Sequence, residues 1–494
     1  MKQFSEYFSG RASAEECGIA PKSIHRAFSE DGTDFIVALG RENGREVILC
    51  YGNGCCGFSG EEIPAEKKLI KAEESFENCS VLRRLFPFCA PCRVLGRTKT
   101  FGVGDRLGIA GDGHLSLFAK HPDVTPVLAQ QSIRELNLTG RKYEDVLDSA
   151  SLAVFRNDYR GGFGADGDHL KTREEVTYAL GLGFSMLTLD CSEHIKASAA
   201  SAELETLPPI PGEYASLYLG KSFEIGEVDG KPAVVTFDEE SLRRACEVYG
   251  EMLSFAADIY AEFLADGKYG CDFEISIDEV AAPTKPTEHY FVAAELLRRG
   301  VRFATLAPRF CGEFQKGIDY IGDLGQFEEE LKIHCAIAKK LGYKLSIHSG
   351  SDKFSVFPLI GKYTEGVWHV KTAGTNYLEA MRIVAECDPA LYREVHAYAL
   401  AHFSEATKYY HVTTDLSRIP QLSSLSDDEL PGLFAHNDAR QLIHICYGLL
   451  LTAENEKGEP LFRDRLYRLW DENREKYAAA LEKHIGRHLS LLGV

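Results

Sequence analysis

Three histidines, His169, His348 and His369, lie at or near the ends of segments that show the alternating pattern of β-strands. The clearest segment is Tyr343–His348, in which apolar and polar residues alternate and a polar turn containing Gly350 follows at once. Imidazole groups that converge from separate strands, together with carboxylates, bind borderline divalent cations such as zinc, nickel, cobalt or manganese. The sequence therefore predicts His169, His348 and His369 as the ligands of a divalent metal ion.

The strands that would bring these histidines together belong to a longer pattern that begins near residue 97. Eight strand-like segments alternate there with helical patterns, which favours parallel β/α units and predicts a (β/α)8 TIM barrel of the α/β class. Reactions on such barrels occur at the carboxyl ends of the strands. The predicted strands are Phe101–Ala110, Val124–Ala129, Gly162–His169, Phe184–Asp190, Asp272–Asp278, Arg302–Ala307, Tyr343–His348 and Val367–Lys371.

The fifth of these strands indicates which side chains face the barrel axis. Its apolar residues alternate with Glu274, Ser276 and Asp278, so we expect these three to point inward. A carboxylate inside a barrel is unfavourable unless it is paired or bound to a metal. Polar residues are dense at the predicted strand ends, which indicates a reactive site: Asp105, Arg106, Gln130, Arg134, Asp166, Asp168, His169, Lys171, Asp190, His194, Asp278, Glu279, Arg309, His348, Asp352, Lys353, His369, Lys371 and Thr372.

The segments outside this pattern predict additional parts. Residues 1–95 contain two strand-like runs joined by the turn sequence RENG and are predicted to form a small α+β domain. The catalytic barrel is predicted to cover residues 96–415, with an insertion at about 195–240, after the fourth strand, that contains a hairpin. Residues 416–494 are predicted to form a helical extension.

Two short motifs have the spacing of cofactor sites. Gly52–Gly57 matches the spacing G-x-G-x-x-G of dinucleotide-binding loops, but Pro64 stands where the supporting helix should run. We therefore interpret the segment as a glycine-rich loop and expect no nucleotide cofactor. Cys89 and Cys92 have the spacing of a zinc-binding or redox pair, but no second pair of matching spacing completes a site.

The overall charge restricts the class of partner. A formal net charge of -19 argues against nucleic acid or an anionic membrane as a partner, while a small anionic substrate could still meet a local cationic pocket. We find no signal-peptide pattern and no apolar run of membrane-spanning length, and we expect a cytoplasmic protein whose 14 cysteines are mostly free thiols. A homo-oligomer is possible on this evidence.

The same segments carry a family resemblance. Over residues of about 100–415 the chain resembles the metal-dependent tagaturonate/fructuronate epimerases of hexuronate breakdown. The resemblance implies an isomerase that interconverts D-tagaturonate and D-fructuronate with the help of a divalent metal ion. The motifs that carry it are GDRLG (104–108), PVLAQQSIREL (126–136), GFGADGDHLKT (162–172), EISIDE (274–279), LAPRFCGEF (306–314), SIHSGSDKFSV (346–356) and HVKTAGT (369–375).

The reaction implied by this resemblance constrains the mechanism. It inverts a hydroxyl-bearing carbon two bonds from a ketone, and the carbonyl does not acidify the proton on that carbon. Of the two remaining routes, oxidation by a nicotinamide and retro-aldol cleavage, the second is preferred because the dinucleotide motif lacks its structural context. Asp168 and His169 resemble the Asp-His pair of metal-dependent class II aldolases. By that resemblance Asp168 is the predicted acid/base, Asp278 a second base or ligand, and Lys371 the electrostatic partner of the developing oxyanion.

The uronate carboxylate is expected to bind a cation near the strand ends, and an arginine is the better bidentate match. The predicted substrate-binding residues are Gln130, Arg134, Lys171, Asp190, Arg309, Asp352, Lys353 and Thr372. Two alternatives stay open. One is a metal-dependent aldolase or ketose isomerase that acts on another sugar or sugar acid, and the other is a non-catalytic sugar-acid-binding protein. A nicotinamide-dependent oxidoreductase is a more distant third.

Overall fold

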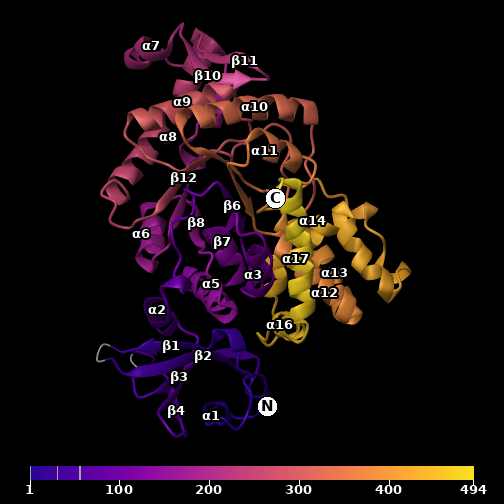
Figure 1. Cartoon of the computed structure of the whole chain (residues 1–494). Coiled ribbons are helices and arrows are strands. Elements are labelled where there is room, and N and C mark those ends of the chain that lie inside the picture. Colours follow the sequence, from indigo (N-terminus) through magenta and orange to yellow (C-terminus); the bar gives the residue numbers. More distant parts are fainter. Residues whose placement is uncertain (1, 30–31, 55–56) are drawn as a thin grey trace.

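Eight parallel strands close into a barrel at the centre of the molecule (Figure 1). The computed structural model describes residues 2–29, 32–54 and 57–494. The strands follow one another around the barrel in chain order, and the last pairs with the first to close it. They are β6 (Lys99–Val103), β7 (Val124–Ser132), β8 (Gly164–Leu170), β9 (Met186–Asp190), β12 (Asp272–Ser276), β13 (Thr305–Ala307), β14 (Lys344–Ile347) and β15 (Trp368–Thr372). The predicted (β/α)8 barrel is therefore confirmed.

The first strand is shorter than the sequence predicts. Its predicted range extended to Ala110, but β6 ends at Val103 and a turn follows. The carboxylate of Asp105 accepts hydrogen bonds from the backbone N–H groups of Leu107, Gly108 and Ala110, at 3.1, 2.9 and 2.7 Å. This local capping by an aspartate side chain gives the backbone an alternative to the sheet ladder, so the strand stops early.

Helices surround the barrel, and capping residues set where they begin and end. In the helix after β8, Thr172 caps the first turn by accepting from the N–H of Glu175, and Gly183 ends the helix in the left-handed conformation. The helices between the barrel strands are α3 (Gly111–Lys120), α4 (Ile133–Thr139), α5 (Tyr143–Asn157), α6 (Arg173–Leu182), α7 (Gly212–Tyr218), α8 (Glu239–Phe263), α9 (Pro286–Arg298), α10 (Leu324–Leu341) and α11 (Phe357–Tyr363).

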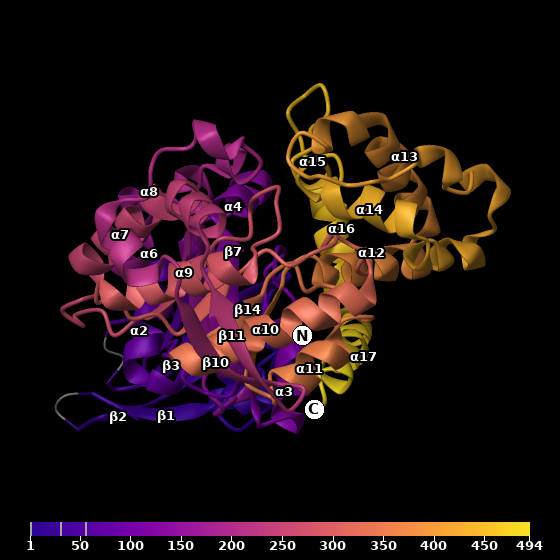
Figure 2. The same cartoon turned by 90° about the horizontal axis from the view of Figure 1, so that it is seen from above.

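The last helix, α17 (Arg474–Leu491), returns to the barrel wall. It packs against α3 and α11, the helices that follow the first and seventh barrel strands, and so occupies the place of an eighth outer helix. Its Ile485 and Leu489 belong to the barrel core. The preceding helices form a group with its own core to one side of the barrel (Figure 2). They are α12 (Thr375–Cys387), α13 (Pro389–Ala406), α14 (Asn437–Ile445), α15 (Tyr447–Leu451) and α16 (Arg463–Glu472).

This packing differs from the predicted boundary at residue 415. The core of the C-terminal helices already includes α12 and α13, which precede that boundary. The helix α17 lies after it and contributes Tyr477, Ala480 and Leu481 to that core but Ile485 and Leu489 to the barrel core. Helical periodicity identifies an apolar face but not the surface that the face will meet.

The N-terminal part is an antiparallel sheet that contacts α5 of the barrel. Its predicted hairpin is confirmed, since β2 pairs with β3 across the turn at residues 43–44. Of the Gly52–Gly57 motif, Cys55 and Cys56 lie outside the described residues, and the described cysteines are all free thiols. The elements are α1 (Phe4–Phe8), β1 (His25–Phe28), β2 (Asp34–Glu42), β3 (Arg45–Gly52), β4 (Glu61–Ile63), β5 (Leu69–Glu73) and α2 (Phe76–Leu85).

The insertion after the fourth barrel strand contains the predicted hairpin, β10 (Ser222–Val228) and β11 (Lys231–Thr236). It covers α9 and α10 on the outside of the barrel, where the Tyr218 hydroxyl donates to Glu295 at 2.6 Å. In the described part of the chain no helix combines the length and apolar content needed to span a bilayer. Short 3₁₀ helices occupy Glu15–Cys17, Pro21–Ser23, Pro87–Cys89, Ser192–His194, Ala197–Ala200, Leu204–Thr206, Leu416–Arg418, Leu422–Ser424 and Asp427–Ala435.

Candidate active site

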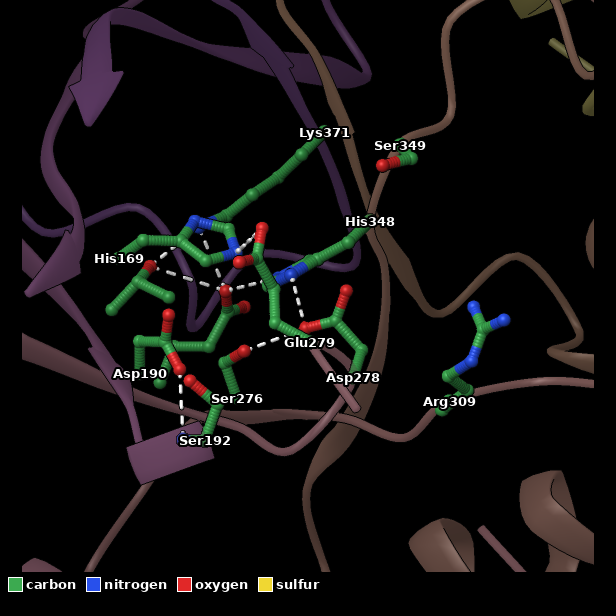
Figure 3. Close-up of polar contacts among 12 residues, drawn as sticks. His169, Asp190, Ser192, Ser276, Asp278, Glu279, Arg309, His348, Ser349 and Lys371 are labelled. Atoms are coloured by element: carbon green, nitrogen blue, oxygen red, sulfur yellow. Dashed lines mark hydrogen bonds and ion pairs between the residues drawn. The ribbon is translucent and has the colours of Figure 1, made fainter. Parts of the chain in front are cut away.

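His169, Asp278 and His348 meet at the carboxyl end of the barrel (Figure 3). Each offers one ligand atom, and these atoms all lie within 4.8 Å of one another. The residues come from β8, from the loop after β12 and from the end of β14, so three separate strands deliver them. Two imidazoles and a carboxylate at this spacing suit a borderline divalent cation with positions left open for a ligand.

His348 is held by carboxylates on both sides of its ring. Its Nδ1 donates to Asp278 at 2.9 Å and its Nε2 donates to Glu274 at 2.8 Å. Burial by itself lowers the pKa of His348, but these two carboxylates raise it to about 9. Glu274 is fully buried in β12 and fixes the ring from below. A carboxylate that orients an imidazole in this way is the usual outer support of a histidine metal ligand.

His169 has the same kind of support and a free coordinating nitrogen. Its Nδ1 donates to Asp168 at 2.8 Å, while its buried Nε2 has no hydrogen-bond partner among the described residues. The backbone of His169 has φ +54°, in the left-handed region that costs a non-glycine residue energy. A buried imidazole nitrogen without a hydrogen-bond partner, beside Asp278 and His348, has the chemistry of a metal ligand, so the residues present fit a metal ion.

Lys371 joins the two supporting carboxylates. Its Nζ lies 2.8 Å from Asp168, 2.8 Å from Glu274 and 2.6 Å from Asp166, and its side chain is almost wholly buried. The carboxylates hold the pKa of Lys371 well above its ordinary value, against the effect of burial. Asp168 and Lys371 were predicted to be catalytic. In the structure both are buried beside the metal-compatible group, where Asp168 accepts from His169 and from Lys371.

His369, predicted as a third imidazole ligand, lies outside the metal-compatible group. In the parallel ladder His369 pairs with Ser346, two residues before His348, so it lies one layer deeper in the barrel. There its Nδ1 bonds the Thr100 hydroxyl at 2.9 Å. Burial lowers the pKa of His369 to about 3, which keeps the ring neutral.

A cavity of about 530 Å³ opens above the group. Asp278, Glu279 and His348 form its inner end, and three cations, Arg134, Arg309 and Lys316, contribute to its wall. Figure 3 shows Arg309 standing apart from the His-Asp group, with no bond to the other residues drawn. The cavity is lined by Arg134, Asp278, Glu279, Val280, Ala281, Pro308, Arg309, Phe310, Glu313, Phe314, Gln315, Lys316, His348, Ser349, Tyr409, Tyr410 and His411.

Glu279 is the acidic group best placed between the metal-compatible group and the cavity. Its Oε1 is 3.8 Å from Nε2 of His169, and its two carboxylate oxygens accept from one nitrogen of Arg134 at 3.2 and 3.0 Å. Arg134 in turn lies against the ring of Tyr410, 5.9 Å from its centroid. Burial raises the pKa of Glu279, but His169 and Arg134 lower it below the ordinary value, so the side chain is an available proton acceptor at neutral pH.

Of the predicted substrate-binding residues, Arg134 and Arg309 line the cavity. Lys353 and Asp352 do not, because both are saturated by internal partners. The buried Lys353 ammonium donates to the carbonyls of Gln315, Ile318 and Ser351 at 2.8, 2.6 and 2.9 Å. Through these bonds Lys353 anchors the loop after β13.

Asp352 is bound instead to the C-terminal helices, where it accepts from Arg440 and His484, each at 2.6 Å. Thr372 is buried and donates to the Gly102 carbonyl at 2.8 Å. Gln130 is also buried, with its Nε2 donating to the carbonyl of Thr372 at 3.4 Å. None of these three lines the cavity.

Lys171 and Asp190 form a pair at the neighbouring strand end. The Nζ of Lys171 lies 3.5 Å from Oδ2 of Asp190, and Oδ1 of Asp190 accepts from the backbone N–H of Ser192 at 2.9 Å. In the sheet Asp190 pairs with Ser276, just before Asp278 (Figure 3). Lys171 and Asp190 therefore lie next to the metal-compatible group but do not line the described cavity.

Comparison with known proteins identifies the family. The tagaturonate epimerase family matches residues 25–492. The chain belongs to this family. It is 43% identical over 427 residues to the tagaturonate/fructuronate epimerase of Thermotoga maritima, covering 85% of this chain and 86% of that protein. Crystal structures of the fructuronate-tagaturonate epimerase of Cohnella laeviribosi, native and with one glycerol, are 49% identical, cover 99% of both chains and superpose with a TM-score of 0.92. The predicted resemblance is confirmed, and the protein is an epimerase of the isomerase class.

Several residues that line the cavity of this epimerase were not predicted from the sequence. Lys316 lies in the loop after β13, where its Nζ donates to the Ser349 hydroxyl at 3.1 Å. The sequence feature that could have indicated Lys316 is its place in a polar loop that follows a strand. Glu279 was recognised as a strand-end residue but was not assigned to the site. Tyr409, Tyr410 and His411 come from the segment after α13, and nothing in their local sequence places them beside the barrel.

Proposed function

We propose that this epimerase interconverts D-tagaturonate and D-fructuronate in the described cavity by retro-aldol cleavage and re-addition with a divalent metal ion. The observation that carries the proposal is the meeting of His169, Asp278 and His348 at the inner end of a cavity with three cations in its wall. The names of the relatives support the substrate pair.

His169, Asp278 and His348 would hold the metal ion. A divalent cation bound there would supply Lewis-acid polarisation of the substrate's ketone and hydroxyl oxygens. Asp168 and Glu274 keep the two imidazoles oriented, and Lys371 offsets part of the negative charge of these carboxylates. This arrangement explains why so many ionisable groups lie buried at one end of the barrel.

Glu279 is proposed as the acid/base at the inverted carbon. It accepts the hydroxyl proton while the bond to the carbon adjacent to the ketone breaks, leaving an aldehyde and an enediolate. After the aldehyde rotates, the enediolate adds to its opposite face and Glu279 returns the proton, so that all atoms are retained and one centre is inverted. Arg134 holds the Glu279 carboxylate toward the cavity throughout.

Arg309 is proposed to bind the substrate carboxylate. Its Nε is buried and has no hydrogen-bond partner within the described ranges, and its nearest carboxylate is Glu313 at 3.8 Å. A guanidinium with donors to spare matches a carboxylate bidentately. Lys316 adds a second positive charge on the same side of the cavity.

The test is conversion of D-tagaturonate by the purified protein, stripped with a chelator and then supplied with a divalent metal. Fructuronate should form only after metal is restored. With substrate deuterated at the inverted carbon, the deuterium should be retained without a primary isotope effect, because the C–H bond does not break. Absence of fructuronate would overturn the substrate assignment, and a primary isotope effect would overturn the retro-aldol route.

A further inference from the structure

A second cavity, of about 670 Å³, lies between the barrel and the C-terminal helices. It shares no lining residue with the active-site cavity. Its walls come from the loops after β13 and β14, from α12, from α14 with the segment before it, and from α17. The lining residues are Ile318, Asp319, Asp352, Phe354, Glu379, Arg382, Pro431, Phe434, Ala435, Asn437, Arg440, Ala480, Lys483, His484 and Arg487.

The carboxylates in this cavity are already engaged by the protein. Asp352 accepts from Arg440 and His484, Glu379 accepts from Arg382, and Asp319 accepts from the backbone and hydroxyl of Ser355. The cations outnumber them. They are Arg382, Arg440, Lys483 and Arg487, with His484 as a fifth whose pKa is raised by Asp352 against the effect of burial.

Two of the cations have no acidic partner. Throughout residues 2–29, 32–54 and 57–494, no carboxylate lies within 4.0 Å of the side-chain nitrogens of Lys483 or Arg487. They stand one helical turn apart on α17, so both project to the same side. The guanidinium of Arg487 lies 3.8 Å above the ring of Phe354, which fixes it at the cavity wall.

A metal ion is a poor occupant of this place, although ligand atoms of Asp352, His484 and His488 lie within 4.8 Å of one another. Nε2 of His488 accepts from the backbone N–H of Asp352 at 3.0 Å, and its Nδ1 donates to the carbonyl of His484 at 2.9 Å. Both nitrogens are therefore occupied. Arg440, 2.6 Å from the carboxylate of Asp352, would repel a cation.

We propose that this cavity binds a small oxyanion with two negative charges, of the phosphate class, through Lys483 and Arg487, with Arg440 adding positive charge beside them. Phosphate oxygens accept several charge-assisted hydrogen bonds at once, and an arginine and a lysine on successive turns of a helix supply donors of matching reach. No carboxylate in the cavity has to be displaced, because each already has a partner.

The bound anion would also contact the support of the active-site loop. Arg440 donates through Nε to the carbonyl of Gly317 at 2.7 Å, next to Lys316, which lines the active-site cavity. Lys353 ties the carbonyls of Gln315 and Ile318 in the same loop. An anion that orders Arg440 therefore orders this loop, and the two cavities are linked by one short segment of backbone.

The experiment measures inorganic phosphate binding to the chelator-treated full-length protein by calorimetry at constant ionic strength. Wild-type protein should bind phosphate saturably. The affinity of the double variant K483Q/R487Q should be lower by a factor of about ten or more, since two charge-assisted contacts are lost. The matched control K340Q/R468Q removes an exposed lysine and arginine elsewhere and should bind as wild type does. R309Q should also retain binding, which separates this cavity from the active site.

Hydrogen exchange then locates the ligand. Phosphate should slow amide exchange in residues 480–490 and 313–321 of the wild-type protein but not of K483Q/R487Q. Equal binding by K483Q/R487Q and wild type, no binding by wild type, or loss of binding in R309Q would each overturn the proposal. A phosphorylated sugar acid tested in the same way identifies the source of the anion: tighter binding assigns the site to a phosphorylated metabolite, and weaker binding assigns it to free phosphate.

Discussion

The Nζ atom of Lys371 lies 2.8 Å from Oδ1 of Asp168. This buried ion pair adjoins the metal-compatible group of His169, Asp278 and His348. Asp168 orients His169, while Glu274, bound by the same ammonium, orients His348. One lysine thus positions two imidazoles from different strands.

Replacing Lys371 by methionine should weaken metal binding and destabilise the fold. Three buried carboxylates would lose their shared partner, at a cost of roughly 3–5 kcal/mol, and the imidazoles would lose orientation, which lowers metal affinity about 10–100-fold. Metal titration and urea unfolding measure the two effects. Lys171→Met is the matched control, because Lys171 is partly exposed at the same end of the barrel and should change neither strongly. An unchanged metal affinity in Lys371→Met would contradict the positioning role.

The layer difference between His348 and His369 predicts different consequences for their removal. His348→Ala should lose the bound metal on purification, since it deletes one of three converging ligands. His369→Ala should retain the metal, because His369 lies one layer deeper and outside the group. Elemental analysis of both proteins after identical dialysis decides the point. Loss of metal from both variants would restore His369 as a ligand.

Glu279→Gln should lower kcat by about 10²–10⁴-fold with metal content unchanged, because the amide cannot accept the hydroxyl proton. The matched control is Glu313→Gln, another carboxylate of the same cavity wall, which should alter KM more than kcat through its neighbour Arg309. Steady-state kinetics of the two metal-loaded variants separate the roles. A Glu279→Gln enzyme with near-normal kcat would transfer the acid/base role to another group.

The stability of the metal-free protein should fall as the pH rises from about 6.5 to about 9. The folded-state pKa of His348 is about 9, above the ordinary value of about 6.5, so its protonated form favours the folded state. That contribution is complete below the unfolded pKa and is lost through the folded one, at up to about 3 kcal/mol. Urea unfolding of wild type and His348→Gln, with chelator at pH 6 and pH 9.5, measures it. The difference between the two proteins should shrink at the higher pH, and a constant difference would refute the linkage.

Local sequence patterns were sufficient to find the eight strands, although not the end of the first one, and to find the inward face of the fifth strand. Alternation placed Glu274, Asp278 and His348 inward, and the structure brings Asp278 and His348 together with His169. Local patterns also predicted the eight β/α units, since each apolar run and each helix end is encoded within a few neighbouring residues.

Alternation does not encode height along the barrel. The pairing of His369 with Ser346 is set by the stagger between strands when the barrel closes, so a histidine on the correct face came to lie in the wrong layer. The same limit applies to Asp168 and Lys371, whose polar character was evident but whose place below the site depends on that stagger.

What the sequence by itself determined is therefore the barrel, its inward face and the chemistry of the donors, because these follow from short-range periodicity and residue type. Only the tertiary structure decided which donors share a layer, that Lys353 and Asp352 are bound by internal partners, and that Tyr409 to His411 reach the cavity. Most of these are contacts between residues far apart in the chain, and they form only when the strands close into the barrel and the C-terminal helices pack against it.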